Sequence, residues 1–293
     1  MEWADKLLQL MVSGIALGAV YGIVGLGFNI IYNATGVINF AQGEFVMLGG
    51  MLATALVAAH VPLAATLPLC TFAVAVVGLL LERLAIRPLQ KSSLMSMITV
   101  TIGASVLLRG VAKALWGANS VALAPFSGTA PLHVGGVVVD RQELWVCATA
   151  LLTVVGSHLF FTCTLAGKAM RACAINASAA RLAGVSVERM TLLAFAISAG
   201  MSGLAGVVLT PLTMVSYSSG TPWAVKGFCA AIVGGLGNGL GAVVGGLLLG
   251  ILEALGSGIL SSGYKNAIAL LVLLLVLLFR PSGVLGRKAA SGL

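Results

Sequence analysis

Residues 7–31 read LLQLMVSGIALGAVYGIVGLGFNII and contain no charged residue. An α-helix rises about 1.5 Å per residue and the hydrocarbon core of a bilayer is about 30 Å thick, so a membrane span needs roughly 20 mostly apolar residues. This stretch is long enough, and we predict that it crosses a membrane as a helix. Three further stretches meet or nearly meet the same test, namely residues 62–81, 144–163 and 191–209.

Five weaker apolar stretches occupy much of the remaining chain: residues 45–59, 94–108, 224–236, 240–255 and 267–279. Several are too short for a simple span, which indicates tilted, broken or re-entrant helices. We therefore predict an all-α fold, a polytopic transmembrane helix bundle of about eight or nine membrane segments that forms a single domain over residues 1–293. The runs are apolar throughout and lack the alternation of barrel strands.

Composition and charge placement support this prediction and give an orientation. Only 8% of the residues are charged, against roughly 25% in soluble domains. Ten of the sixteen basic residues fall into three groups: Arg83, Arg87 and Lys91; Lys168, Arg171, Arg181 and Arg189; and Arg280, Arg287 and Lys288. The positive-inside rule makes these groups and the C-terminus cytoplasmic. The net charge of +8 thus follows from topology, and nothing points to nucleic acid. The side of the N-terminus depends on whether residues 32–43 form a turn or a re-entrant break.

Residues 31–45, IYNATGVINFAQGEF, place polar side chains between two apolar segments. Non-helical backbone at membrane depth must be shielded by protein or line a water-filled cavity. Asn39, Gln42 and Glu44 are therefore candidates for a translocation path, and the alternative is a polar turn at the membrane surface. The same argument applies more weakly to Lys226 and Glu253, for which a helix end or a paired charge is the alternative.

The polar loop at residues 164–190 is rich in alanine, and we predict one short cytoplasmic helix in it that stops near Gly184. Its basic residues, Lys168, Arg171 and Arg181, suit a helix that lies on anionic lipid. A rigid helix with small side chains equally suits a docking surface for a cytosolic partner. Chemistry alone leaves both interpretations open.

Glycines spaced four residues apart predict close helix packing. They are Gly14, Gly18 and Gly22, then Gly241 and Gly245, and then Gly246 and Gly250; Ser202 and Gly206 form a similar pair.

Catalysis and cofactor binding find no support. The three histidines and five cysteines are scattered, so no metal-ligand spacing appears. No nucleophile-elbow or zinc-protease motif is present. The pair Gly167-Lys168 lacks the rest of a phosphate-binding loop, so we expect this chain itself to bind no ATP, cofactor or metal and to be no enzyme.

Six motifs in order resemble the branched-chain amino acid ABC-importer permeases, most of all the shorter of the two permeases that pair in these importers. They are NFAQGEF (39–45), ERLAIRPL (82–89), GKAMRACA (167–174), ARLAGVSVERM (180–190), AAIVGGLGNGLGAVVGGLLLGILEAL (230–255) and LLFRPSGVLG (277–286).

The resemblance implies a permease domain in a bacterial inner membrane with four kinds of partner: a second homologous permease, two cytosolic ATPase subunits that bind ATP, a periplasmic solute-binding protein and membrane lipid. It also implies that residues 167–185 carry the helix that couples to an ATPase, with Gly167, Lys168, Arg171, Arg181 and Gly184 as its site residues. It supports Asn39, Gln42 and Glu44 as path residues.

Two departures and one rival interpretation accompany the resemblance. The family usually has His at the position of Gln42 and an acidic residue at Asn176. The first leaves the solute open among branched-chain amino acids, urea, short amides and aromatic acids. A secondary transporter or channel is also a bundle with broken helices, and an inverted repeat would favour it; the sequence displays no convincing repeat.

Overall fold

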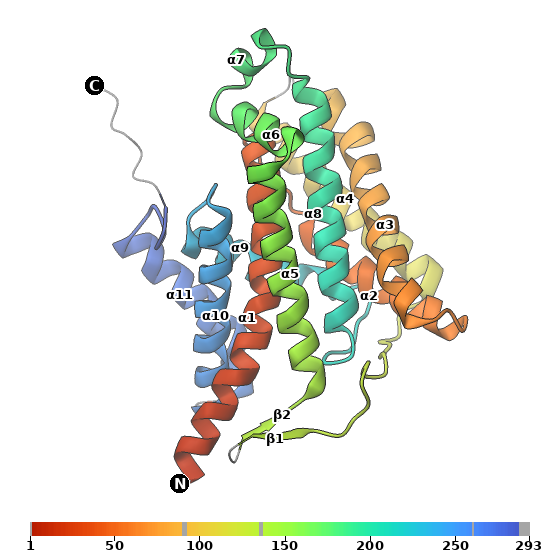
Figure 1. Cartoon of the computed structure of the whole chain (residues 1–293), viewed down its shortest axis with the longest axis vertical. Coiled ribbons are helices and arrows are strands. Elements are labelled where there is room, and N and C mark those ends of the chain that lie inside the picture. The colour runs from red at the N-terminus through yellow and green to blue at the C-terminus, as the bar shows by residue number, and fades with distance from the viewer. Residues whose placement is uncertain (1, 90–92, 135–136, 260, 287–293) are drawn as a thin grey trace.

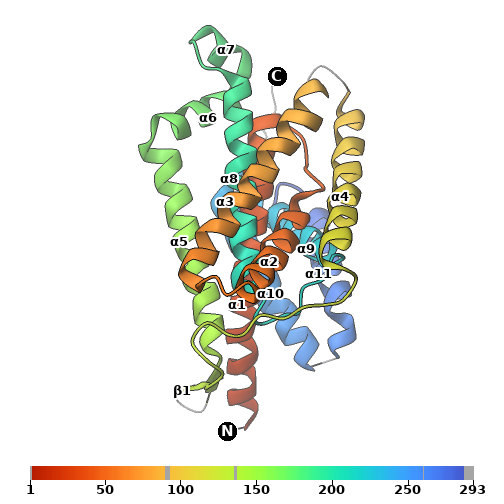
Figure 2. The ribbon, with the colours of Figure 1, turned by 90° about the vertical axis from the view of Figure 1, so that its right-hand side faces the viewer.

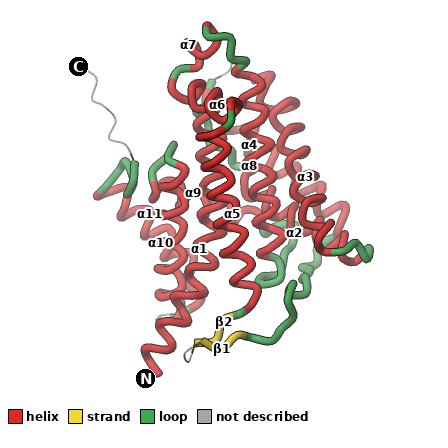
Figure 3. Tube along the Cα trace, in the orientation of Figure 1, coloured by secondary structure: helices red, strands yellow, loops and turns green. Residues whose placement is uncertain are grey.

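The computed structural model describes residues 2–89, 93–134, 137–259 and 261–286, and most of them are helical (Figures 1 and 3). The helices are α1 (Glu2–Thr35), α2 (Gln42–Ala58), α3 (Leu63–Leu81), α4 (Leu94–Trp116), α5 (Arg141–Cys163), α6 (Leu165–Ile175), α7 (Ala177–Leu182), α8 (Val187–Leu209), α9 (Gly220–Gly234), α10 (Gly239–Ile259) and α11 (Lys265–Phe279). Within these residues, six helices are long and apolar enough to cross a membrane, and α2 and α11 are shorter apolar helices. Each of the nine apolar stretches coincides with one helix, so the predicted helix bundle is confirmed.

Two features differ from the expected outline. Helix α4 does not stop at residue 108 but continues through Arg109 and Lys113 to Trp116, because isolated charged residues do not end a helix that protein partly covers. The stretch between α4 and α5 holds a small antiparallel hairpin, β1 (Leu132–Val134) with β2 (Val137–Val139). An antiparallel bridge between Val121 and Val215 also ties this stretch to the segment after α8.

Polar connections hold the described members of the three predicted basic groups at one end of the bundle, the upper end in Figure 1. Arg87, which follows α3, pairs with Glu188 in the first turn of α8. The segment after α11 bonds back to the end of α9, since the amide of Val284 donates to the Val233 carbonyl at 2.8 Å. Lys91, Arg287 and Lys288 lie outside the described residues. The described members of the three predicted basic groups thus lie at the same end of the bundle.

The glycine stripes bring helix backbones into contact as predicted. A Cβ added to Gly18 of α1 would lie 2.7 Å from the Gly246 carbonyl oxygen of α10, and one added to Gly250 would lie 2.4 Å from the backbone of Gly18. On α8, a Cβ at Gly206 would lie 2.0 Å from the Val46 carbonyl oxygen of α2. Such distances leave no room for a side chain.

Helices α2 and α9 are half-helices that begin inside the bundle. After α1 ends, residues 36–41 return toward the middle of the bundle, as Figure 2 shows, and α2 starts beside Gly27 of α1. After α8, residues 210–219 return in the same way, and α9 starts against α2, where a Cβ on Gly43 would lie 2.1 Å from the Gly220 carbonyl oxygen. With 15 residues, α9 is about 22 Å long and cannot span a bilayer alone.

The helix directions reveal an inverted repeat that we did not find in the sequence. The run α1–α4 and the run α8–α11 each consist of a full helix, a half-helix and two further helices, and the two runs point in opposite directions (Figures 1 and 2). Helix α1 is antiparallel to α10, since Gly14 meets Gly250 whereas Gly22 meets Val243. The repeat lies in the order and direction of the helices, which composition and hydropathy do not record.

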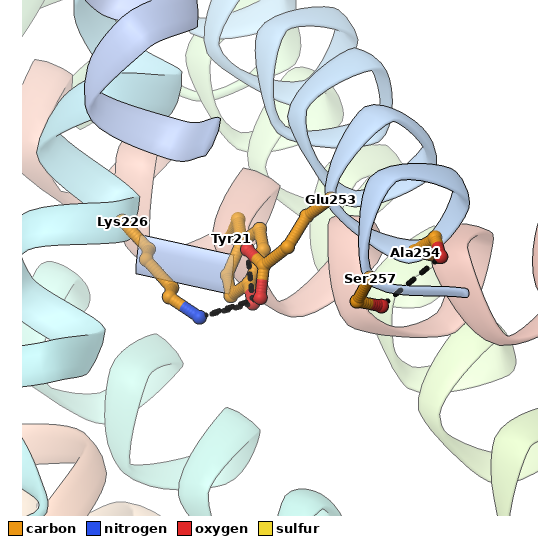
Figure 4. Close-up of polar contacts among 5 residues, drawn as sticks. All are labelled: Tyr21, Lys226, Glu253, Ala254 and Ser257. Carbon is orange, nitrogen blue, oxygen red and sulfur yellow. Dashed lines mark hydrogen bonds and ion pairs between the residues drawn. The ribbon is translucent and has the colours of Figure 1, made fainter. Parts of the chain in front are cut away.

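A buried polar cluster joins α1, α9 and α10 (Figure 4). Lys226 Nζ lies 2.7 Å from Glu253 Oε1 and 3.1 Å from the hydroxyl of Tyr21, which donates to Glu253 Oε2 at 3.1 Å. Tyr21 and Glu253 are buried. For Lys226 and Glu253, this arrangement fits the paired-charge alternative and joins three helices.

We predict that Gly18→Ala destabilises the bundle, because the new methyl group must displace the backbone of α10. Overpacking of this kind costs about 1–3 kcal/mol, which thermal unfolding in detergent would detect. The matched control is Gly156→Ala in α5, where an added Cβ meets nothing within 4 Å. Equal melting temperatures for both variants would show that the α1–α10 contact is looser than described.

We predict that Glu253→Gln lowers the melting temperature strongly, because it leaves the Lys226 ammonium without its charged partner. Breaking a buried ion pair costs about 3–5 kcal/mol. The double variant Lys226→Met/Glu253→Leu removes both charges and should recover much of the loss. Ser257→Ala is the control, since that hydroxyl bonds only one turn back on α10, to the Ala254 carbonyl (Figure 4). If Glu253→Gln melted at the wild-type temperature, the Lys226–Glu253 ion pair would not stabilise the packing of the three helices.

Candidate functional site

The break between α1 and α2 is held by its own polar side chains. Helix α1 ends at Thr35, and the next residue, Gly36, has a φ of +70°, the left-handed conformation that commonly follows a helix. The buried Asn39 accepts a hydrogen bond from the Ala41 amide at 3.1 Å, and its side-chain amide nitrogen is buried without a hydrogen-bond partner among the described residues. Its backbone carbonyl accepts from the amide of Gln42, where α2 begins. The break therefore lies inside protein, as predicted for non-helical backbone at membrane depth.

Gln42 fastens the start of α2 to α8. Its side chain donates to the Ser202 hydroxyl at 2.7 Å and accepts from the Ser198 hydroxyl at 3.0 Å. A Cβ on Gly27 of α1 would collide with the Gln42 amide at 2.2 Å. Gln42 is thus enclosed between α1 and α8, and its amide group fixes the depth at which α2 begins.

Glu44 lies two residues further along α2 and is 1% exposed. Its Oε1 accepts a hydrogen bond from the Ser105 hydroxyl of α4 at 2.9 Å and lies 3.5 Å from Nε of Arg109. Its Oε2 lies against Gly220 in the first turn of α9 and, in the part of the chain that the structure describes, is buried without a hydrogen-bond partner. The carboxylate therefore sits where α4 meets the starts of both half-helices.

Ser105 and Arg109 line a cavity of about 190 Å³ between α4, α9 and the break. Its walls include the aromatic rings of Phe28, Phe40 and Phe228. The Arg109 side chain is 33% exposed on a face that also exposes Ile102 of α4 and Val225 of α9. A charged side chain open to lipid within a spanning helix is costly, so this face suits contact with further protein.

The polar loop forms two helices, α6 and α7, and not the single helix expected. The correction has a local cause: Asn176 has an extended backbone that ends α6, and its side chain accepts a hydrogen bond from the Ala179 amide, which starts α7. The predicted stop is confirmed, since α7 ends at Leu182 and Gly184 has a φ of +83°. Gly167 is buried, and a Cβ there would meet the Phe160 carbonyl oxygen of α5 at 2.2 Å.

The outer surface of α6 and α7 is basic and apolar together. Lys168, Arg171 and Arg181 are exposed. Three large apolar side chains beside them are also almost fully exposed, namely Leu165 at 85%, Ile175 at 87% and Leu182 at 92%. We call this surface, residues 165–182, the α6–α7 platform.

A second cavity of about 190 Å³ lies beneath the platform. Met170 and Arg171 of α6 line it together with Asn33 near the end of α1 and with Gly237 in the turn between α9 and α10. That turn is bonded to α1, since Asn33 Nδ2 donates to the Gly237 carbonyl at 3.0 Å. The platform, the end of α1 and this turn therefore lie at the same end of the bundle.

Sequence reasoning missed Arg109 and Ser105. The available signal was a lone arginine that follows an apolar run, and we took that charge for the end of the span.

Among the described residues, no group of three or more metal-ligating side chains occurs.

Comparisons with known proteins agree with this architecture. Residues 10–279 match the family model described as "Branched-chain amino acid transport system / permease component". The chain is 31% identical to the high-affinity branched-chain amino acid transport system permease protein BraD of Pseudomonas aeruginosa and 32% identical to LivH of Escherichia coli, each over 96% of both chains. It is 30% identical to a probable LivH of Methanocaldococcus jannaschii, over 90% of this chain and 88% of the relative.

A solved structure shares the fold. It is PsaBC from Streptococcus pneumoniae in complex with Fab, with a TM-score of 0.52, 14% identity and coverage of 94% of this chain and 92% of that one. At this identity the likeness speaks for the fold alone. The family match spans nearly the whole chain, and the relatives are transport permeases and not enzymes. This chain belongs to the permease family of branched-chain amino acid ABC transporters.

Proposed function

We propose that this chain forms one half of the translocation path of an ATP-driven importer in a bacterial inner membrane. A second homologous permease supplies the other half, two cytosolic ATPase subunits bind and hydrolyse ATP, and a periplasmic solute-binding protein delivers the solute. The platform end, with the C-terminus, faces the cytoplasm. The solute is a branched-chain amino acid or a related small polar molecule such as urea, an amide or an aromatic acid. The chain itself performs no covalent chemistry.

The α6–α7 platform carries the ATPase part of this proposal. Exposed leucine and isoleucine side chains outside the membrane-spanning helices are unfavourable in water, and patches of this kind mark interaction sites. Lys168, Arg171 and Arg181 give the same surface a positive charge that suits an acidic groove. A lipid surface would accept the same side chains, so the experiments below separate the two partners.

The exposed face around Arg109 supports the second permease. In the importer, homologous protein would cover Ile102, Arg109 and Val225 and remove the cost of an arginine in contact with lipid. The path then runs between the two permeases, beside the break that holds Asn39, Gln42 and Glu44.

Coupling follows from the contacts of the platform. Gly167 packs against α5, and Arg171 shares a cavity with the end of α1 and with the α9–α10 turn. ATP-driven closure of the ATPase subunits would push the platform as a rigid body, and this movement would reach α1 and α9 through that turn. Further along α1, Gly27 lies beside Gln42, where α2 begins, and Gly220 is the first residue of α9. The bundle would thereby switch between outward-open and inward-open states.

We expect affinity purification of tagged protein in mild detergent to recover a second permease and two nucleotide-binding subunits, with ATP hydrolysis in the eluate. Identification of the co-purifying chains by mass spectrometry is the measurement. Repeated recovery of this chain alone or as a homo-oligomer, without an ATPase, would favour a secondary transporter or a channel.

We predict that Arg171→Glu abolishes solute uptake and solute-stimulated ATP hydrolysis while the protein still inserts into the membrane, because reversed charge on the platform repels an acidic groove. Lys6→Glu, an exposed charge reversal at the opposite end of α1, is the control and should transport normally. If the platform contacts only lipid, Arg171→Glu will retain its ATPase subunits and its uptake, and the coupling role is then wrong.

A further inference from the structure

We propose that the cavity between α4, α9 and the break, with Arg109 at its polar end, is the site that binds the carboxylate of the transported solute. The solute class is a small carboxylate with an apolar side chain, to which branched-chain amino acids belong. This inference rests on the proposed function and adds to it a membrane-embedded subsite with a defined chemistry.

Arg109 is held for this purpose by one buried partner. Glu44 Oε1 lies 3.5 Å from Nε of Arg109 and accepts a hydrogen bond from Ser105. Within the described residues, the terminal guanidinium nitrogens of Arg109 make no hydrogen bond, whereas the side chain lines the cavity. Nε of Arg109 faces Glu44 in an ion pair without a hydrogen bond among the described residues, and the two terminal nitrogens of a guanidinium form a fork that binds a carboxylate in bidentate geometry.

The charge balance at this point favours an anion. Helix α2 begins at Gln42 and α9 begins at Gly220, and each helix start carries about half a positive charge. Glu44 supplies one negative charge against these two helix ends and Arg109, which leaves about one positive charge. Thr221 lies in the first turn of α9 and lines the cavity, where backbone N–H groups have no partner within the helix. An anionic group would neutralise the excess.

The remainder of the cavity suits an apolar side chain. The rings of Phe28, Phe40 and Phe228 stand around it, with ring centroids of Phe28 and Phe40 lying 5.7 and 6.2 Å from that of Phe228. The cavity volume of about 190 Å³ is below the roughly 300–1,000 Å³ of sites for drug-sized ligands. A molecule of a few heavy atoms with one charged end therefore matches both its size and its lining.

A thiol reporter tests the site in the assembled importer. Thr221→Cys places an exposed thiol in the cavity, in a Cys147→Ser background, and the exposed native Cys163 serves as the reference thiol outside it. Labelling by a maleimide is followed for each cysteine by peptide mass spectrometry. The probes are L-leucine, 4-methylpentanoate, which lacks the ammonium group, and isoamylamine, which lacks the carboxylate.

We expect L-leucine and 4-methylpentanoate to slow maleimide labelling of the cysteine at position 221, and isoamylamine to leave it unchanged. Labelling of the reference thiol, Cys163, should respond to none of the three probes. Arg109→Gln should raise the half-protecting concentration by about tenfold to a hundredfold, because a charge-assisted pair is lost, and Arg109→Lys should fall between. Lys113→Gln removes a charge one turn along α4, at a side chain that stacks on Tyr217, and should leave protection unchanged.

Two results would overturn the site. One is an absence of protection by L-leucine in a preparation whose ATP hydrolysis responds to solute. This result would contradict the binding site but not the proposed importer, and it would fit an Arg109 that pairs with the second permease. The other is equal protection with and without Arg109. Should Arg109→Gln fail to fold, Arg109→Gln/Glu44→Gln, which leaves no unpaired charge, carries the same comparison. Failure to recover any ATPase would instead contradict the proposed function.

Discussion

Backbone that leaves helical geometry inside a membrane must find its hydrogen bonds within the protein, and this constraint shapes the bundle. Both breaks are enclosed by helices of the opposite half of the inverted repeat. Helix α2 lies along α8 and α9 lies along α1, and the two half-helices meet at Gly43 and Gly220, where the absence of side chains permits contact. At this junction Gln42 bonds to two serines of α8 and Glu44 bonds to Ser105 of α4. The breaks are therefore parts of the architecture, with partners supplied from distant sequence.

The same enclosure links the middle of the membrane to the platform end. Helix α1 carries Gly27 beside the start of α2 and, two turns further on, Asn33 beside the turn between α9 and α10. Asn29 adds a bond to that turn, donating to the Asn238 carbonyl at 2.8 Å. Rigid helices transmit displacement along their axes, so in the proposed mechanism a shift at the turn would reach both half-helix starts. Close glycine packing between α1 and α10 makes this body stiff.

Hydropathy predicted every membrane helix, because the length of an apolar run is a local property. The partners of polar side chains are not local. Glu44 meets Arg109 of α4 and Gly220 of α9, and no spacing rule connects these positions. A charge that appears to end a span can belong to its interior, as Arg109 shows. Asn176 divides the polar loop at residues 164–190 because its side chain caps a second helix, and an alanine-rich pattern does not predict this division. The break and its polar residues were predictable, whereas the cavity beside them was not.

Inverted repeats with broken helices also occur in secondary transporters, so the arrangement of the bundle does not identify the source of energy; a fold alone does not fix a function. The distinguishing part is the α6–α7 platform. A transporter driven by an ion gradient takes its energy from sites inside the membrane and does not require exposed apolar side chains such as Ile175 and Leu182 on a platform of this kind. An importer driven by cytosolic ATPases needs a surface of this kind, joined firmly to the helices that move. In the proposed importer, Gly167, packed against α5, would provide that attachment, and the family to which the chain belongs agrees with this source of energy.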